Sequence, residues 1–175
     1  MCKRVGRMNA TIHIVTGAPG SGKTTALTAL LHRATPYVAF DIDWLAIPAS
    51  QLAQSDIFFD RTTWPAYTTL WFEILHSVHK NGKLAIFFAP IDLYDLAMYG
   101  QPTWCERVAW LLLDCDDSTR QDRLGGRSGG TAAMIAEAIT DAYVLRGQVA
   151  DRIDTGRHTP DEVAAAIALW VEQTG

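Results

Sequence analysis

Hydrophobic residues in this chain gather into short runs that are separated by polar or helix-patterned stretches. Four of the runs cover residues 11–16, 37–42, 84–89 and 108–113, and a shorter one ends at Ile153-Asp154. Continuous apolar runs of this length are typical of strands that are buried on both faces of a parallel sheet. The pattern therefore predicts five strands.

Between the runs, apolar residues recur every three or four positions, as they do along the buried face of a helix. The clearest stretches begin near residues 23, 65, 134 and 160. The last one opens with a capping box, in which Thr159 is the N-cap and Glu162 is the third helical residue. Residues 92–99 are compatible with either a short helix or an ordered loop.

The alternation of strands and helices predicts an α/β fold with three layers, α/β/α, around a five-stranded parallel sheet. We expect a tail over residues 1–10 and a single domain over residues 11–175. Ligands of such sheets bind at the carboxyl ends of the strands. Candidate functional residues are therefore sought at those ends.

Composition narrows the class of protein further. The chain has 175 residues, of which 49% are hydrophobic, and its formal net charge is -4. A negative balance argues against non-specific binding to nucleic acid or to an anionic membrane surface. No apolar run approaches the length of a membrane span, and three cysteines without C-x-x-C spacing fit a reducing compartment. We expect a soluble cytoplasmic protein, either a monomer or a homodimer.

The strongest motif lies between the first strand and the first helix. It fits G-x-x-x-x-G-K-[ST] and consists of Gly17, Ala18, Pro19, Gly20, Ser21, Gly22, Lys23 and Thr24, followed by Thr25. Glycines let the backbone N–H groups of such a loop face phosphate oxygens at a helix N-terminus. Lys23 is then expected to reach the β- and γ-phosphates, and the Thr24 hydroxyl to hold Mg²⁺. The alternative is an ordinary glycine-rich turn, which the strand–helix context disfavours.

Two carboxylates, Asp41 and Asp43, end the second hydrophobic run. Beside a phosphate loop, Asp41 is predicted to hold the metal, and Asp43 to accept the proton of the acceptor. The alternative is that Asp43 only caps a short helix that begins near Trp44.

Arginines follow the fourth run in a segment rich in glycine. Arg120 and Arg123 would lie on adjacent turns of a helix, and Arg127 stands between Gly125-Gly126 and Gly129-Gly130. We predict a lid over about residues 117–130, in which Arg123 and Arg127 stabilise charge and Arg120 contacts the nucleotide. The alternative is a solvated basic helix with a loose loop.

Other candidates rest on position alone. Arg157 follows the last strand, where a nucleotide base often lies, although it could equally be a surface residue. The acceptor is expected to bind within about residues 44–104, where Trp44 and Asp92 are the predicted contacts. His76 and His79 have no further ligand nearby in the sequence, so we predict structural roles for them.

At these residues the chain resembles the P-loop small-molecule kinases of the shikimate kinase, gluconate kinase and chloramphenicol phosphotransferase group. The phosphate loop, the D-x-D at residues 40–45, the R-L-x-x-R ending of residues 113–127 and the turn at 153–163 all resemble that group. The resemblance implies a shikimate-kinase-like P-loop NTPase fold, ATP as donor, Mg²⁺ held through Asp41, and Asp43 facing the acceptor hydroxyl. It does not extend to the acceptor site, because Ala89-Pro90-Ile91 replaces the glycine triplet of shikimate kinase.

The predicted function is therefore ATP-dependent phosphorylation of a hydroxyl group on a small molecule. Between Asp43 and Thr103 the cations, histidines aside, are Arg61, Lys80 and Lys83. Because buried anions need paired cations, we expect a neutral or cationic acceptor, such as an antibiotic or a nucleoside-like compound. The alternatives are a nucleotide-hydrolysing switch without an acceptor and, with less support, a polynucleotide 5′-hydroxyl kinase.

Overall fold

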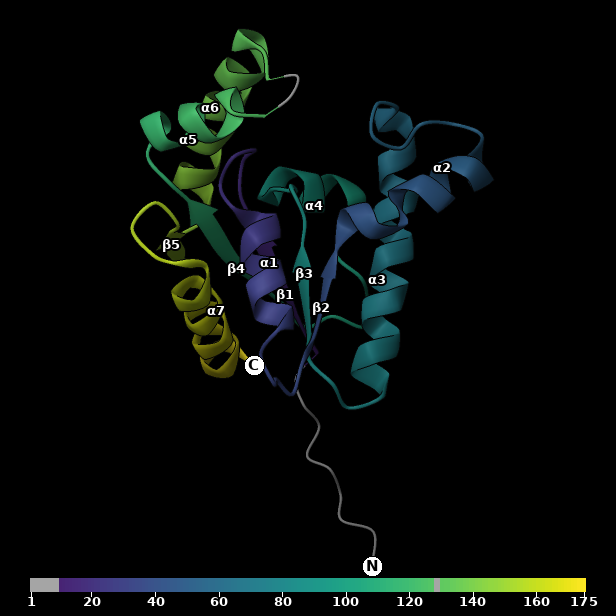
Figure 1. Ribbon diagram of the computed structural model, residues 1–175. Coiled ribbons are helices and arrows are strands. Elements are labelled where there is room, and N and C mark those ends of the chain that lie inside the picture. The colour runs from purple at the N-terminus through teal and green to yellow at the C-terminus, as the bar shows by residue number, and fades with distance from the viewer. Residues whose placement is uncertain (1–9, 128–129) are drawn as a thin grey trace, which may run out of the picture.

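The computed structural model describes residues 10–127 and 130–175, and its centre is a five-stranded sheet (Figure 1). The predicted tail, residues 1–10, lies outside the described residues except for Ala10, and so does Gly129 of the predicted lid. The strand order is β2-β3-β1-β4-β5, and all neighbouring strands are parallel. The strands are β1 (Thr11–Thr16), β2 (Val38–Asp41), β3 (Ala85–Phe88), β4 (Arg107–Asp114) and β5 (Arg152–Asp154).

The predicted α/β fold with a five-stranded parallel sheet is thus confirmed, and each hydrophobic run overlaps one strand. The helices are α1 (Lys23–Leu31), α2 (Ala46–Ala53), α3 (Trp64–Lys80), α4 (Leu93–Tyr99), α5 (Asp117–Gly125), α6 (Ala132–Gln148) and α7 (Pro160–Thr174), with 3-10 helices η1 (Ile42–Leu45) and η2 (Arg61–Thr63). Within the described ranges, no helix combines the length and the apolar character that crossing a bilayer requires.

Side chains of the helix termini explain several of these boundaries. The capping box predicted at Thr159 and Glu162 is present at the start of α7. A second capping box, formed by Asp92 and Asp95, begins α4 and decides between the helix and the loop that the sequence left open. Helix α2 was not predicted, because its sequence lacks a clear apolar period.

Successive residues of β1 point to opposite faces of the sheet, and each face has its own helices. Val15 packs in a cluster with side chains of α1 and α7, whereas Ile14 packs in a cluster with side chains of α3. A smaller cluster joins Leu112 of β4 to α6. The helices therefore cover both faces, which is the predicted three-layer arrangement.

Because all five strands are parallel, their carboxyl ends lie at one edge of the sheet. At this edge β1 leads into the phosphate loop, β2 ends at Asp41, and β4 ends at Asp114. The α5–α6 unit and the α2 segment rise on either side of this edge (Figure 1). The fold thus brings the predicted site residues from different segments to one place.

Candidate active site

The phosphate loop connects β1 to α1, and its glycines are required by its shape. A Cβ atom on Gly17 would lie 2.4 Å from the carbonyl oxygen of Leu113, which no side chain could tolerate. Gly22 is the N-cap of α1 and has a positive φ of 88°, a left-handed conformation that favours glycine. Among the described residues, no side chain caps the N-terminus of α1. Its N–H groups are therefore available to an anion, as the binding of a nucleotide phosphate requires.

Lys23 lies within the loop, where its ammonium group donates hydrogen bonds to backbone carbonyls. Nζ bonds to the carbonyl of Gly17 and lies 3.5 Å from that of Ala18. Burial lowers the pKa of Lys23 to about 8, against the opposing effect of Asp41 and Asp43. A polyanion bound nearby would raise the pKa of Lys23, because the negative charge would stabilise its ammonium form.

The two aspartates at the end of β2 have different local roles. Asp41 is the N-cap of η1, and its Oδ1 accepts a hydrogen bond from the backbone N–H of Asp43 at 3.1 Å. The helix cap is therefore Asp41, and the alternative that Asp43 caps a helix near Trp44 is wrong. Burial raises the pKa of Asp43, and the negative charge of Asp41 adds to this effect while Lys23 opposes it.

A cavity of about 240 Å³ brings the predicted phosphate, metal and proton-accepting groups together. It is lined by the phosphate loop from Pro19 to Thr25 together with Asp41, Asp43, Pro90 and Arg127. Thr24 and Asp41 supply the oxygen atoms that Mg²⁺ prefers as ligands. Lys23 and Arg127 supply positive charge on the same cavity, so the residues present fit a magnesium–triphosphate group.

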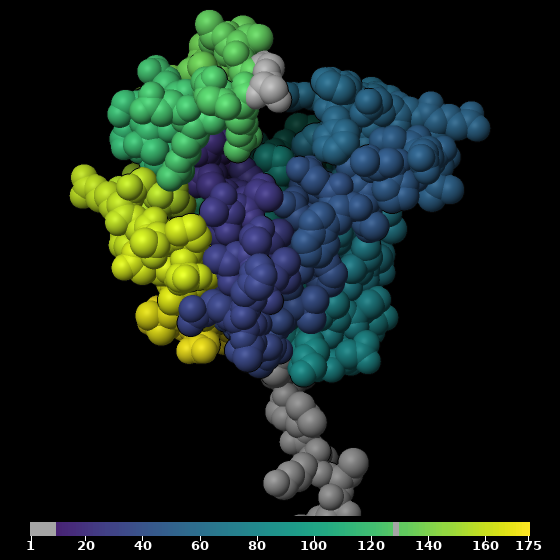
Figure 2. Space-filling view, viewed as in Figure 1, coloured from purple at the N-terminus to yellow at the C-terminus, as the bar shows by residue number. Residues whose placement is uncertain are grey.

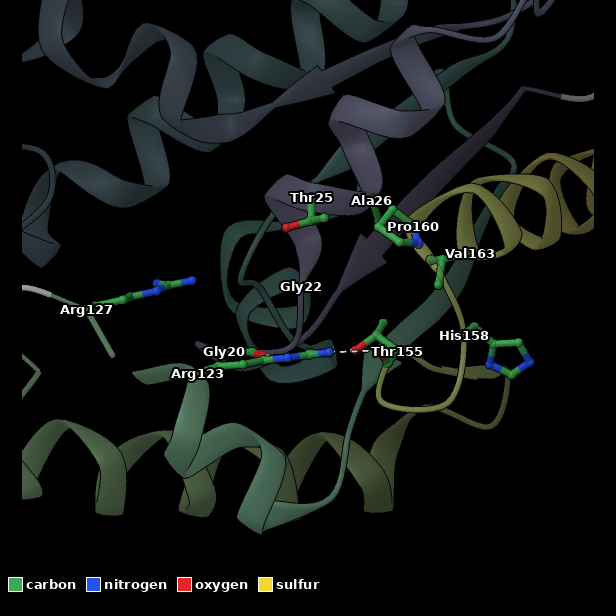
Figure 3. Close-up of a pocket in the computed structure, with 10 residues that line it drawn as sticks. All are labelled: Gly20, Gly22, Thr25, Ala26, Arg123, Arg127, Thr155, His158, Pro160 and Val163. Atoms are coloured by element: carbon green, nitrogen blue, oxygen red, sulfur yellow. Dashed lines mark hydrogen bonds between the residues drawn. The ribbon is translucent and has the colours of Figure 1, made fainter. Parts of the chain in front are cut away.

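A second cavity, of about 340 Å³, adjoins the loop on the side of α7 (Figure 3). Its lining includes Arg123, Arg127, Thr155, His158 and Val163. This is the region in which the base of a nucleotide was expected to bind. Apolar and polar groups meet here, as is common in small-molecule sites.

Arg157 lies in the same turn, but its side chain is 84% exposed and forms an ion pair with Asp154 at 3.2 Å. It is not among the residues that line the second cavity. The structure therefore places the neighbouring His158, and not Arg157, at the predicted base site.

The three arginines of the predicted lid have three different environments. Arg120 is fully buried and donates to the Asp114 carboxylate at 2.6 Å and to the carbonyl of Pro19 at 2.7 Å. This differs from the prediction that Arg120 contacts the nucleotide, because its guanidinium supports the loop from within the protein. Because Arg120 is buried, it also does not fit the alternative prediction of a solvated basic helix. The predicted helix does form, as α5, but Arg120 lies on its buried face.

Arg123 and Arg127 remain on the cavities. Arg123 donates to the carbonyls of Gly20 and Thr155 and to the Thr155 hydroxyl. Arg123 lines the second cavity but not the first, whereas Arg127 lines both cavities. Of the predicted pair, the structure therefore brings only Arg127 beside Lys23, Asp41 and Asp43.

The predicted acceptor contacts are less well defined. Asp92 caps α4, and its second oxygen accepts a hydrogen bond from Gln148 at 3.2 Å. Both of its oxygens are thus engaged within the protein, a structural role that the sequence did not suggest. Trp44 is half exposed and packs edge-on against Phe40, 6.4 Å between ring centres. Their predicted roles in acceptor binding stay predictions.

The structural roles of the two histidines on α3 are visible. His76 stacks parallel on Trp104 with ring centres 4.7 Å apart, and His79 stacks on the same ring at 6.0 Å. Across residues 10–127 and 130–175, no group of three or more His, Cys, Asp or Glu side chains is clustered in a metal-binding arrangement.

The molecule is hollowed between the α5–α6 unit, drawn in green, and the α2 segment, drawn in blue (Figure 2). Helix α6 contributes charge to this region. Burial and Glu137 raise the pKa of Asp141, whereas Arg61 and Lys23 act to lower it. Sequence reasoning missed Asp141, which falls far from every recognisable motif.

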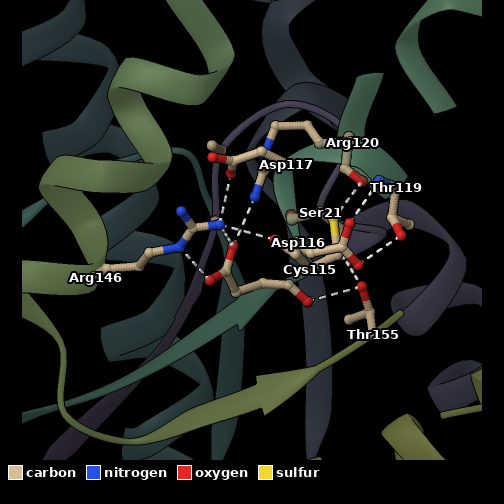
Figure 4. A network of polar contacts seen from close by, with 12 residues as sticks. Ser21, Cys115, Asp116, Asp117, Thr119, Arg120, Arg146 and Thr155 are labelled. Atoms are coloured by element: carbon tan, nitrogen blue, oxygen red, sulfur yellow. Dashed lines mark hydrogen bonds and ion pairs between the residues drawn. The ribbon is translucent and has the colours of Figure 1, made fainter. Parts of the chain in front are cut away.

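Three further residues were also missed. Asp114 ends β4 and binds both Arg120 and Arg146, and Thr155 joins this network from the turn after β5 (Figure 4). An acidic residue at the carboxyl end of a buried strand was a visible signal for Asp114. Nothing in the sequence marked Arg146, because its partners come from two other segments.

Comparisons with known proteins agree with this fold. No protein-family model matches the sequence, and none of the curated proteins matches it. Solved structures do match. The tunicamycin resistance protein of Deinococcus radiodurans is 21% identical with a TM-score of 0.67, covering 94% of this chain and 96% of that one. A gluconokinase from Sinorhizobium meliloti 1021 is 16% identical with a TM-score of 0.64, covering 95% and 94%.

A chain of the Pnkp1/Rnl/Hen1 RNA repair complex also matches, with 17% identity and a TM-score of 0.58 over 84% of this chain and 48% of that chain. At these identities the likeness establishes the fold. The chain thus has a P-loop kinase-like α/β fold, as the resemblance of its motifs predicted.

Proposed function

We propose that the protein is an ATP- and Mg²⁺-dependent kinase that phosphorylates a hydroxyl group of a small molecule. One observation carries the proposal: Lys23, Thr24, Asp41, Asp43 and Arg127 line a single cavity at the carboxyl edge of the sheet. A simple phosphate-binding site would need only the loop and a cation. The additional carboxylate of Asp43, whose pKa is raised, supports a proton acceptor.

When bound, ATP supplies the γ-phosphoryl group and Mg²⁺ neutralises part of its charge. Thr24 and Asp41 are the residues that would hold the metal, and the N–H groups at the start of α1 would face the phosphates. Asp43 takes the proton as the acceptor's O–H bond breaks and its oxygen bonds to phosphorus, with ADP as the leaving group. Lys23 and Arg127 stabilise the negative charge, so positioning and electrostatics provide most of the acceleration.

We also propose that the acceptor is neutral or cationic. Burial raises the pKa of both Asp95 and Asp141, and the negative charge of Asp92 adds to this effect, whereas the positive charge of Arg61 acts to lower both. A carboxylated or phosphorylated acceptor would be repelled by these side chains and would find few cations to pair with. Exposed aromatic side chains, such as those of Trp44 and Tyr94, could pack against a ring of the acceptor.

The test is a screen for acceptor-stimulated ADP release across hydroxyl-bearing metabolites and antibiotics. Tunicamycin belongs in the panel, because a structural match is a tunicamycin resistance protein. Shikimate, gluconate, a nucleoside monophosphate and a 5′-hydroxyl oligonucleotide represent the competing classes. We expect a neutral or amine-bearing compound to raise the rate of ADP release, and the phosphorylated product to appear by mass spectrometry.

Asp43→Asn is the matched control, since it should bind ATP but give no product. If no compound raises ADP release above the basal rate, the nucleotide-hydrolysing alternative is favoured. A highest kcat/KM for the oligonucleotide would support the polynucleotide kinase instead. A highest kcat/KM for shikimate, gluconate or the monophosphate would overturn the proposed charge of the acceptor.

A further inference from the structure

Consecutive carbonyls of the phosphate loop are held by side chains from outside the loop. The carbonyl of Pro19 accepts from Arg120 at 2.7 Å, and that of Gly20 accepts from Arg123 at 3.2 Å. The carbonyl of Ser21 accepts from the Thr155 hydroxyl at 2.7 Å. The two arginines come from α5 and Thr155 from the turn after β5.

These anchors influence the opposite side of the loop. In a trans peptide the C=O and the following N–H point in opposite directions. Holding the carbonyls of Pro19 and Ser21 on the protein side therefore directs the N–H groups of Gly20 and Gly22 to the other side. The intervening N–H, that of Ser21, donates to the carbonyl of Ala18 at 3.1 Å. The contacts from α5 and from the turn after β5 thus hold the loop with the N–H groups of Gly20 and Gly22 facing away from these contacts.

Thr155 occupies the junction between these segments (Figure 4). Its hydroxyl accepts from Arg123 Nη1 at 2.9 Å, and Arg123 Nη2 donates to its carbonyl at 2.8 Å. The hydroxyl also lies 3.0 Å from the Asp114 carbonyl. That carbonyl already accepts the backbone N–H of Thr155 at 2.7 Å. The Thr155 hydroxyl has one hydrogen to donate. We assign it to the Ser21 carbonyl, because the Asp114 carbonyl already has another donor and the Ser21 carbonyl needs this one.

We propose that Thr155 is a positioning residue that couples helix α5 to the phosphate loop. The residue is only 7% exposed, so loss of the hydroxyl would leave the Ser21 carbonyl and an Arg123 N–H without this partner in a buried place. Both the loop and α5 would shift to find new partners. The role deepens the proposed function and rests on it, in that the loop is taken to bind ATP.

The experiment compares Thr155→Val, which is close in shape but has no hydroxyl, with Thr155→Ser, which keeps it. Thr68→Val is the matched control, because Thr68 is a fully buried threonine on α3, in another part of the fold. Amide hydrogen exchange of the nucleotide-free protein is followed across residues 19–24 and 117–125, and ATP affinity is measured by calorimetry. We expect Thr155→Val to speed exchange in both segments and to weaken ATP binding about tenfold. Thr155→Ser and Thr68→Val should resemble the wild type in both measurements.

Unchanged exchange in Thr155→Val would overturn the proposal. Faster exchange in the loop but not in α5 would refute the coupling and leave a local brace. If the wild type bound no ATP, the proposed function would fail, whereas the exchange comparison would still decide the coupling. Arg123→Met approaches the junction from α5 and should also speed exchange in the loop; it provides the test if Thr155→Val does not fold.

Discussion

The backbone N–H of Asp43 donates to the carboxylate of Asp41 at 3.1 Å, so the two acids at the end of β2 are fixed relative to each other by one turn of η1. One oxygen of Asp41 is engaged in this cap. Burial raises the pKa of Asp43, and the nearby negative charge of Asp41 adds to this effect. The short turn η1 therefore places Asp41, the candidate metal ligand, close to Asp43, the candidate proton acceptor.

The first prediction tests that separation. Asp43→Asn should keep ATP affinity within about threefold, because binding does not need the proton acceptor, but lower turnover about 10²- to 10⁴-fold. Steady-state kinetics and calorimetry on the same preparation measure the two effects. Glu172→Gln, a change at an exposed acidic residue near the end of α7 and outside the lining of this cavity, is the control.

The pH profile provides an independent check on the same residue. Asp43 must be ionised to accept a proton, and its pKa is raised above the ordinary value of 3.8. Wild-type kcat/KM should therefore fall as the pH drops through this raised pKa, and the residual activity of Asp43→Asn should lack that acid limb. An identical acid limb in both proteins would remove Asp43 from the role of base.

The second prediction concerns Lys23, whose pKa is lowered to about 8 in the nucleotide-free protein. The charge of bound ATP should raise this pKa, because it favours the ammonium form. Near and above pH 8 the protein should consequently take up a proton on binding ATP. Its affinity should fall as the pH rises above about 8, by at most about tenfold per pH unit.

Calorimetry in two buffers that differ in ionisation enthalpy measures the proton uptake directly. Lys23→Met should weaken ATP binding strongly and abolish the uptake, whereas Lys80→Met, at the end of α3, should do neither. If proton uptake persisted in Lys23→Met, another group would be responsible for it.

The third prediction concerns Arg127 and Arg120, two arginines of the predicted lid whose environments differ. Arg127 lines both cavities, so Arg127→Ala should lower kcat about 10²- to 10³-fold with little effect on the free energy of unfolding. Arg120→Met should instead lower that free energy by about 3 kcal/mol, because it removes a buried ion-pair partner of Asp114. Urea unfolding and turnover are measured for both.

Arg157→Ala is the matched control, since this exposed arginine forms a surface ion pair with Asp154 and should change either quantity little. A stable Arg120→Met with wild-type stability would show that the buried pair with Asp114 contributes nothing net to folding.

The contrast between Arg120 and Arg127 also shows how far the sequence could be interpreted. Local patterns predicted the strands, the phosphate loop and the capping box of α7, because each depends on neighbouring residues. The same patterns placed Arg120 and Arg123 on one helix and Arg127 in a glycine-rich segment, but could not tell which arginine faces inward. That depends on Asp114 and on the Pro19 carbonyl, which only the folded chain brings to Arg120.

In the region between β2 and β4, local sequence patterns were likewise not enough to predict the roles of individual residues. Its acceptor contacts were predicted from residue type and position alone, and Asp92 proved to cap a helix whose existence the sequence left open. Thr155 and Asp141 gave no signal, because a threonine in a turn and an acid on a helix are common everywhere. Their placement depends on how the loop and α6 pack against distant segments.

The last prediction concerns His13, which lies in the middle of the central strand β1. It is fully buried, and its ring meets Trp170 of α7 edge-on with centres 5.4 Å apart. Burial lowers the pKa of His13 to about 4, and Arg107 adds to this effect while the backbone of Thr174 opposes it. The folded protein therefore disfavours the imidazolium form.

In the unfolded chain the same histidine should titrate near its ordinary pKa of 6.5. Between about pH 6.5 and 4 the unfolded state then binds more protons than the folded state, so the free energy of unfolding must fall as the pH falls through this window. The shift corresponds to a loss of at most about 3 kcal/mol at the acid end. Urea unfolding at pH 7.5 and pH 4.5 should show a smaller difference for His13→Leu than for the wild type, whereas the exposed His32→Leu should keep the full difference. An equal pH dependence in His13→Leu and the wild type would mean that other groups cause the acid sensitivity, and that the core accommodates a protonated His13 without this cost.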